Sequence, residues 1–236
     1  MPQIFTMDSQ NGSRPAAFFD LDRTLISVNS AFLYAQYERR RGRISLFQFL
    51  RASFWMGMYH LSMIDMDKAF AAAVRLYRGA HSESLRALTE EFFHQEVIST
   101  FQPGAEPVLD FHRQQNHPLV LLTASSSYMS ELVAETLDFD AWLANIFPTD
   151  DEGRLIGTFQ RPMCYGPGKV HHAENWAAEE GIDLSQSYFY TDSFSDLPML
   201  EVVGNPVVIN PDPRLRRAAL QRGWPIQDWS EPPTEH

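Results

Sequence analysis

The stretch FFDLDRTL, residues 18–25, decides the fold class of this chain. The apolar run AAFF that follows Pro15 predicts a buried β-strand. Asp20 and Asp22 stand at the carboxyl end of this run, and we expect them to project to the same side if the strand continues through them. Ligands of open α/β sheets bind at this end of the strands. Because Asp-x-Asp also occurs in turns and helix caps, the rest of the chain has to separate a chemical role from a structural one.

The composition excludes several classes of function. The chain has 236 residues, which suits one large α/β domain or a core with a smaller lobe. Its formal net charge of −11 argues against a nucleic-acid partner and against binding to anionic membranes. Cys164 is the only cysteine, so an intrachain disulfide is impossible. We therefore expect a soluble protein of the reducing cytoplasm.

Two segments bear on targeting and membranes. MPQIFTMDSQNGSR, the first 14 residues, lacks the basic start and apolar core of a secretory signal, and we expect flexible tails at 1–14 and 230–236. The stretch 44–64 is long enough to cross a membrane, but Arg51 lies near its middle. A buried or interfacial helix is the favoured interpretation of this stretch, and we expect no membrane partner.

The predicted secondary structure changes near Pro103. Residues 29–100 contain no proline, and their pattern predicts four helices with breaks near 42–45, 64–67 and 79–82. Beyond Pro103 strands alternate with helices, which implies right-handed crossovers and a parallel sheet. We predict helices over 104–115, 126–136, 168–180, 197–202 and 213–222, and strands or extended segments over 118–122, 141–147, 155–159, 187–190 and 206–209.

These patterns predict an α/β fold with a three-layer, Rossmann-like parallel sheet and an inserted all-helical cap. The catalytic core is expected to be discontinuous, over 15–28 and 101–229, and the cap to cover 29–100.

Three later sites fall at the carboxyl ends of predicted strands or at a helix start. Thr123 precedes the amides of Ala124 and Ser125, which lead into a helix and suit an anion, although a serine there also caps the helix well. Lys169 begins a helix, against the macrodipole, which hints at function; an exposed lysine of no importance is the alternative.

The third site is the pair Asp192 and Asp196, which follows an apolar and aromatic strand. Asp196 also suits a helix cap, whereas Asp192 is harder to explain in that way. Acids, a hydroxyl and a lysine gathered at one sheet edge suit phosphoryl transfer. Oxygen ligands without histidine or cysteine suit Mg²⁺.

At this point the chain resembles the haloacid dehalogenase superfamily, subfamily IB, in the phosphoserine-phosphatase-like branch with a helical C1 cap. The likeness runs from about Ala16 to Trp224. It rests on four motifs in order: DLDRT at Asp20–Thr24, Thr123, Lys169, and DSFSD at Asp192–Asp196.

The resemblance implies a role for each motif. Asp20 would be the nucleophile that forms an aspartyl-phosphate, and Asp22 the general acid and base. Lys169 would offset the charge on Asp20 and the phosphoryl group. Thr123 and Ala124 would hold phosphate oxygens. Mg²⁺ would be held by Asp20, the backbone carbonyl of Asp22 and Asp192, with support from Thr24, Ser193 and Asp196.

One position departs from the phosphoserine phosphatases that this chain resembles. Nine residues after the nucleophile they carry a glutamate thought to meet the substrate's amino group, whereas this chain has Asn29. We predict that Asn29 contacts the substrate, and phosphoserine is in doubt as that substrate. The cap is expected to set specificity, through candidates that the sequence does not rank: Tyr34, Arg39, Arg75 and Arg78.

The resulting hypothesis is a Mg²⁺-dependent phosphatase of a small phosphate monoester. The alternatives are a phosphotransferase or mutase of the same fold, and a non-catalytic phosphate-binding or membrane-associated protein. The adjacent His171 and His172 face different directions on a helix, which argues against one shared metal. An aromatic stretch in the cap is the candidate surface for a homodimer: Phe47, Phe49, Phe54, Trp55 and Tyr59.

Overall fold

A wholly parallel sheet forms the centre of the molecule. The structure is a computed structural model that describes residues 14–45 and 66–231. Within these residues six strands lie in the order β3-β2-β1-β4-β5-β6. Their bounds are β1 (Ala17–Phe19), β2 (Leu119–Ser126), β3 (Ala141–Asn145), β4 (Tyr188–Thr191), β5 (Asn205–Ile209) and β6 (Ile226–Gln227).

β1 occupies the middle of the sheet, between β2 and β4. Phe19 is opposite Leu121 on one side and Tyr190 on the other. The chain extends the sheet in one direction through β2 and β3 and then returns to extend it in the other direction from β4. Such a reversal of strand order leaves a crevice at the carboxyl ends of the strands, where α/β proteins bind ligands.

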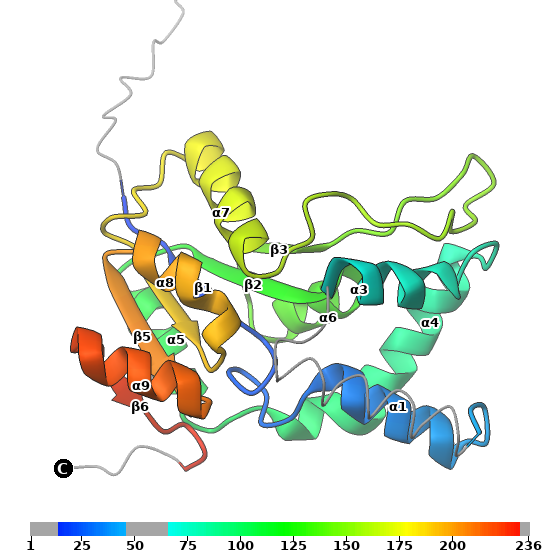
Figure 1. Cartoon of the computed structure of the whole chain (residues 1–236), viewed down its shortest axis with the longest axis horizontal. Helices are drawn as coiled ribbons and strands as arrows, with labels where there is room; N and C mark the ends of the chain where they lie inside the picture. The colour runs from blue at the N-terminus through cyan, green and yellow to red at the C-terminus, as the bar shows by residue number, and fades with distance from the viewer. Residues whose placement is uncertain (1–13, 46–65, 232–236) are drawn as a thin grey trace, which may run out of the picture.

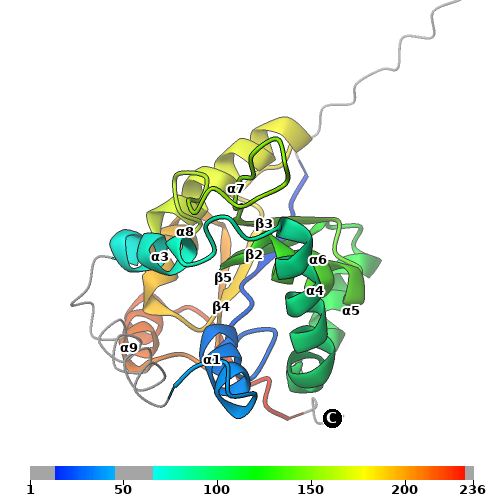
Figure 2. The same cartoon turned by 90° about the vertical axis from the view of Figure 1, so that its right-hand side faces the viewer.

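Helices cover both faces of the sheet, so the fold has three layers (Figures 1 and 2). Consecutive residues of β1 serve the two faces in turn, because strand side chains alternate: Phe18 packs in one core cluster and Phe19 in the other. The Phe19 side is covered by α5 (Ala105–Gln114) and α6 (Ser127–Thr136), and the Phe18 side by α7 (Pro167–Glu180), α8 (Leu197–Val202) and α9 (Pro213–Arg222).

The described elements between β1 and β2 that precede α5 are helical. They are α1 (Ser30–Arg40), α3 (Met66–Arg75), α4 (Ser82–Phe92), a π-helical turn (Phe93–Val97) and a 3₁₀ turn (Ile98–Thr100). The predicted three-layer fold with an inserted helical cap is thus confirmed, while the exact domain boundaries stay a prediction.

Several predictions fall outside the described residues. These are the second cap helix with the apolar stretch 44–64 and its aromatic surface, and nearly all of the two tails. Among the helices that are described, in 14–45 and 66–231, none has both the length and the apolar character needed to cross a bilayer.

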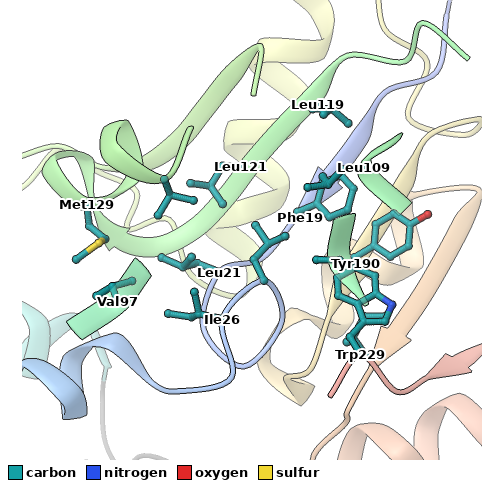
Figure 3. Packing of buried hydrophobic residues seen from close by; sticks show 14 of the residues in the cluster. Phe19, Leu21, Ile26, Val97, Leu109, Leu119, Leu121, Met129, Tyr190 and Trp229 are labelled. Carbon is teal, nitrogen blue, oxygen red and sulfur yellow. The ribbon is translucent and has the colours of Figure 1, made fainter. Parts of the chain in front are cut away.

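The core reaches beneath the loop that follows β1. Figure 3 shows Leu21 and Ile26 from this loop among the buried side chains around Phe19 and Leu121. Both loop residues are fully buried. The Phe19 ring stacks on Tyr190, with centroids 4.6 Å apart. The loop is therefore anchored by burial of its apolar residues, while its polar residues are left at the sheet edge.

Three details differ from the sequence prediction or were missed by it. β1 ends at Phe19, so the condition for Asp20 and Asp22 to project to the same side, a strand that continues through both, is not met; the amides of Thr24 and Ile26 turn back to the carbonyl of Leu21. Residues 155–159 form no strand; only Leu155 makes an isolated bridge, with Thr149. The short edge strand β6 was not predicted, because two paired residues leave too little pattern to detect.

Within 14–45 and 66–231, the other predicted helices and strands are confirmed to within a few residues. α7 ends at Gly181, whose φ of 66° is the left-handed conformation that terminates many helices. β2 is longer than predicted and runs through Thr123 to Ser126. The segment that precedes α6 is thus part of the sheet.

Candidate active site

Asp20 directly follows β1 and is almost fully buried. Its backbone amide donates to the carbonyl of Tyr190 at 2.9 Å, which ties it to the neighbouring strand β4. One carboxylate oxygen, Oδ1, accepts from Nζ of Lys169 at 2.7 Å. Among the described residues the other oxygen, Oδ2, receives no hydrogen bond. The carboxylate is therefore held from one side and open on the other.

Lys169 connects two acids that are far apart in the sequence. It lies in the first turn of α7, as predicted, and only 2% of it is exposed. Its Nζ donates to Asp20 and also to Oδ2 of Asp196, again at 2.7 Å. Thr191 donates its hydroxyl to the same Asp196 oxygen at 2.7 Å. The alternative of an exposed lysine is wrong, because the ammonium is buried between two carboxylates.

Asp196 stands at the N-cap position of α8, but its side chain makes no capping hydrogen bond. It serves instead as the second partner of Lys169. Ser193, predicted to support the site, caps the short 3₁₀ turn Phe194–Asp196 by accepting from the amide of Ser195. The segment after β4 is thus organised by its own polar side chains.

Asp22 lies in the loop beyond Asp20 and is partly buried. Its Oδ1 accepts from the backbone amide of Ser30 at 2.9 Å, and its Oδ2 from Nδ2 of Asn29 at 3.1 Å. Asn29 also caps α1, since its Oδ1 accepts from the amide of Phe32 at 2.9 Å. The predicted substrate contact through Asn29 stays a prediction, but both polar atoms of its side chain already have partners within the protein.

Asp192 follows β4 directly and is 6% exposed. Its carbonyl accepts from the amide of Asp212, the residue that caps α9. Its carboxylate receives no hydrogen bond from the described residues. Asp192 and Asp20 therefore present open carboxylate oxygens from adjacent strands.

The acids outnumber the buried cation. Burial raises the pKa of Asp20 to about 7, and the Asp196 and Asp22 carboxylates add to this effect, while Lys169 opposes it. Burial, with Asp20 and Asp196, raises the pKa of Asp192 well above its ordinary value. For Lys169, burial acts to lower the pKa, but the two carboxylates raise it overall. The acids of the site therefore carry more negative charge than Lys169 alone can balance.

A divalent cation fits this deficit. Oxygen donors and an excess of negative charge are what Mg²⁺ prefers in proteins, and two carboxylates with a carbonyl leave room for phosphate and water. Within 14–45 and 66–231 the acids, histidines and cysteines form no group of three side chains that could hold a metal. The predicted site needs only the Asp20 and Asp192 carboxylates and the Asp22 carbonyl.

Thr123 lies at the same sheet edge, within β2, and is 2% exposed. Its hydroxyl accepts from the amide of Ser125 at 3.2 Å. Ser126 caps α6, accepting from the amide of Met129, which confirms the structural alternative for that serine. The predicted contacts of Thr123 and Ala124 with phosphate stay predictions.

Sequence reasoning missed Asn145, which is almost fully buried. Its Nδ2 donates to the carbonyl of Ala124 at 2.7 Å, and its Oδ1 accepts from the amide of Cys164 at 2.9 Å. It thereby joins the end of β2 to the segment that leads into Lys169. Burial raises the pKa of the Cys164 thiol to about 12, so the thiol stays protonated and unreactive.

Gln102 was also missed, although it supports the loop that carries Asp22. Its Nε2 donates to the carbonyls of Arg23 and Thr24, at 2.9 and 2.8 Å. Its Oε1 accepts from Asn210, whose own Oδ1 accepts from the amide of Trp229. A glutamine that follows a helical zone carries no sequence signal for this role, because its partners are backbone atoms of a distant loop.

Two loop residues stand out in their conformation or contacts. Arg23 is exposed and adopts φ of 58°, a left-handed conformation that costs energy for a residue with a Cβ. Thr24 is fully buried, and its hydroxyl finds no partner in the described part of the chain.

The cap candidates are dispersed. Tyr34 and Arg39 lie on α1 and are partly buried, whereas Arg75 and Arg78 are exposed. The two histidines after Lys169 have separate hydrogen-bond partners. His171 is bonded to Asn175, and His172 is bonded to the carbonyl of Pro162.

A profile of the haloacid dehalogenase-like hydrolase family matches residues 17–201. Since this match covers well over half of the sequence, the chain belongs to the haloacid dehalogenase-like hydrolases. The superfamily expected from the four motifs is therefore confirmed.

Individual proteins are similar to this chain over most of its length. The inhibition of morphological differentiation protein of Streptomyces azureus is 33% identical over 222 residues, which cover 93% of this chain and 80% of that protein. A phosphoserine phosphatase of Mycobacterium tuberculosis is 30% identical over 221 residues, 91% of this chain and 70% of that protein. A solved structure from Bordetella pertussis Tohama I, of unknown function, has a TM-score of 0.82 at 29% identity and covers 92% of this chain and 99% of that one.

Proposed function

We propose that this hydrolase is a Mg²⁺-dependent phosphatase that cleaves a small phosphate monoester through an aspartyl-phosphate on Asp20. The observation that carries the proposal is the state of the Asp20 carboxylate. Lys169 holds Oδ1 at 2.7 Å, while Oδ2 is open at the carboxyl end of the central strand. A fixed carboxylate beside a cation is suited to in-line attack on phosphorus.

In the first step an oxygen of Asp20 attacks phosphorus, and the bond to the ester oxygen breaks. Asp22 gives its proton to the departing alkoxide, which leaves as the alcohol. In the second step Asp22 takes a proton from water as the water oxygen attacks the aspartyl-phosphate. The bond between phosphorus and Asp20 breaks, and inorganic phosphate is released with Asp20 restored.

The other residues have electrostatic and binding roles. Lys169 offsets the charge that gathers on Asp20 and the phosphoryl group, and Asp196 keeps the lysine ammonium in place. Thr123 and Ala124 would contact phosphate oxygens. Mg²⁺ would be held by Asp20, the Asp22 carbonyl and Asp192, and when bound it supplies positive charge that polarises the phosphate. Thr24 and Ser193 would support the loops that present these groups.

The experiment that tests this function is a screen of phosphate monoesters with Mg²⁺, read as released inorganic phosphate. The panel consists of sugar phosphates, amino-acid phosphates, phospholipid head groups and nucleotides. Phosphoserine is included because one relative is named a phosphoserine phosphatase. The expected result is turnover by the wild-type protein and none by a folded Asp20→Asn variant. Near-normal turnover by Asp20→Asn would refute the mechanism.

A phosphotransferase is the second candidate within this fold, since Asp20 would be phosphorylated in both cases. Hydrolysis in the presence of an added alcohol separates the two. A phosphatase releases inorganic phosphate, whereas a transferase forms a new ester. The homodimer through the cap and the cytoplasmic location stay predictions.

A further inference from the structure

We propose that Asn29 is a positioning residue that sets the orientation of the Asp22 carboxyl group for proton transfer to the leaving group. This inference rests on the proposed function, because it concerns how the general acid of that reaction is held. It assigns to Asn29 a role toward the protein's own acid in place of a contact with the substrate.

The Asn29 side chain has a single defined orientation. Its Oδ1 accepts from the amide of Phe32 at 2.9 Å, which is the capping hydrogen bond of α1. An acceptor is required at that position, so the amide nitrogen must point the other way, where it donates to Oδ2 of Asp22 at 3.1 Å. Each polar atom of the Asn29 side chain is therefore committed to a partner within the protein.

The Asp22 carboxyl group is held at both oxygens by the start of one helix. Ser30, the first residue of α1, donates its backbone amide to Oδ1 at 2.9 Å, and Asn29 donates to Oδ2. Ser30 is buried, and its amide direction is set by the helix. The Ser30 bond is thus rigid, whereas the Asn29 bond comes from a side chain and is the longer of the two.

Because the Ser30 bond is rigid and the Asn29 bond is not, we assign different roles to the two carboxyl oxygens of Asp22. A carboxyl group that gives a proton to a leaving oxygen needs one of its own oxygens to face that atom. Oδ1 stays with the backbone of α1, and Oδ2 is the oxygen that exchanges its Asn29 contact for the leaving group. Asn29 therefore fixes the plane of the Asp22 carboxyl group until substrate binds. This limits the orientations that Oδ2 can adopt before it faces the leaving oxygen.

The leaving group provides a test that a purely structural role would not satisfy. An alkoxide leaves poorly unless it is protonated, whereas p-nitrophenolate leaves without help. The parameter kcat/KM covers the steps up to the cleavage of the ester bond. Loss of proton-donor positioning should therefore lower kcat/KM for an alkyl phosphate and spare kcat/KM for p-nitrophenyl phosphate.

The informative variant is Asn29→Ser, because serine keeps a capping oxygen for α1 but its short side chain removes the donor to Asp22. With the best alkyl phosphate from the screen we expect kcat/KM to fall about 10- to 100-fold, a part of the effect of a general acid. With p-nitrophenyl phosphate we expect a change of less than about 3-fold. Asn29→Thr is a second variant that keeps a capping oxygen and lacks the amide donor, in case the serine variant does not fold.

A double-mutant cycle shows whether the effect passes through Asp22. In the background of Asp22→Asn, where the acid is absent, Asn29→Ser should cause no further loss with the alkyl phosphate. Equal losses for both substrates, an additive loss in the cycle, or no loss at all would overturn the inference while the phosphatase function stood. A wild-type protein without activity on either ester would refute the proposed function and this inference together.

Discussion

The ammonium nitrogen of Lys169 lies 2.7 Å from a carboxylate oxygen of Asp20, although 149 residues separate the two in the sequence. Both side chains are buried, and the same nitrogen lies 2.7 Å from Asp196. One cation thus joins the central strand, the start of α7 and the segment after β4. The pairing explains how a charged lysine is accommodated in the interior beside the sheet, and we expect its loss to affect both stability and the proposed chemistry.

Replacement of Lys169 by methionine should destabilise the protein by about 3–5 kcal/mol, because two buried carboxylates lose their common partner. Phosphatase activity should be lost as well. Urea unfolding at neutral pH measures the first effect and the ester assay the second.

A surface pair provides the matched comparison for Lys169. Arg222 and Glu201 are 2.7 Å apart, but both side chains are substantially exposed. Arg222→Met should cost less than about 1 kcal/mol, since exposed ion pairs contribute little. Equal losses from the two variants would contradict the buried-pair explanation.

Removal of Mg²⁺ should lower the melting temperature of the wild-type protein, because a ligand that binds only the folded state stabilises it. Asp192→Asn should abolish this response, since it removes a proposed ligand. In EDTA the same variant should be at least as stable as the wild type, because it loses one buried negative charge from a site that has too many. Thermal unfolding with and without Mg²⁺ tests all three points, and a full Mg²⁺ response in Asp192→Asn would count against the assigned ligand.

His112 should make the stability of the folded protein depend on pH. It is fully buried on α5, where its Nε2 lies 2.8 Å from the Tyr190 hydroxyl and its Nδ1 lies 3.0 Å from Nδ1 of His117. The ring of Tyr188 also packs against it. Burial lowers the pKa of His112 to about 4, and the neighbouring His117 adds to the effect. The folded protein therefore binds this proton less readily than the unfolded chain.

The sign of the pH dependence follows from this lowered pKa. The contribution of His112 to stability is complete above the ordinary value of 6.5 and is lost as the pH falls from there through about 4. We expect up to about 3 kcal/mol of the free energy of unfolding to disappear over this range. Unfolding of the wild type and His112→Gln at several pH values isolates the contribution as a difference in slope.

Gln102→Leu should destabilise the protein by about 1–3 kcal/mol, because the carbonyls of Arg23 and Thr24 lose a buried donor. It should also lower kcat, since the loop that carries Asp22 loses its support. Denaturant unfolding and steady-state kinetics check the two effects. Gln114→Leu, at an exposed glutamine that ends α5, should change stability by less than about 0.5 kcal/mol.

The sequence predicted the sheet, its flanking helices and the acids of the site because these features have local signatures. The apolar run AAFF predicts β1, and Gly181 predicts the end of α7. The four motifs gave the relation between Asp20, Lys169 and Asp192, since the carboxyl ends of parallel strands meet at one edge. These predictions needed only strand order and the position of each residue in its element.

Hydrogen bonds from side chains to distant backbone atoms could not be predicted from the sequence. Gln102 and Asn145 bind carbonyl and amide groups of distant loops, and any residue type provides such groups. The bond between Asn29 and Asp22 depends on how the chain turns after β1, and the sequence left open whether the strand continues there. Long-range geometry of this kind becomes visible only when the loop conformation is known.

The position of β1 in the sheet bears on how the protein is made. The strand that carries the nucleophile pairs with Leu119 and its neighbours on one side and with Tyr188 and its neighbours on the other. On the ribosome it therefore has no partner strand until β2, about halfway along the chain, has been synthesised. The support of the Asp22 loop comes later still, because Gln102 is braced through Asn210 by Trp229. A chain cut short before Trp229 holds every proposed catalytic side chain but lacks the amide that bonds to Asn210, so we expect the loop that carries Asp22 to be less firmly supported in it.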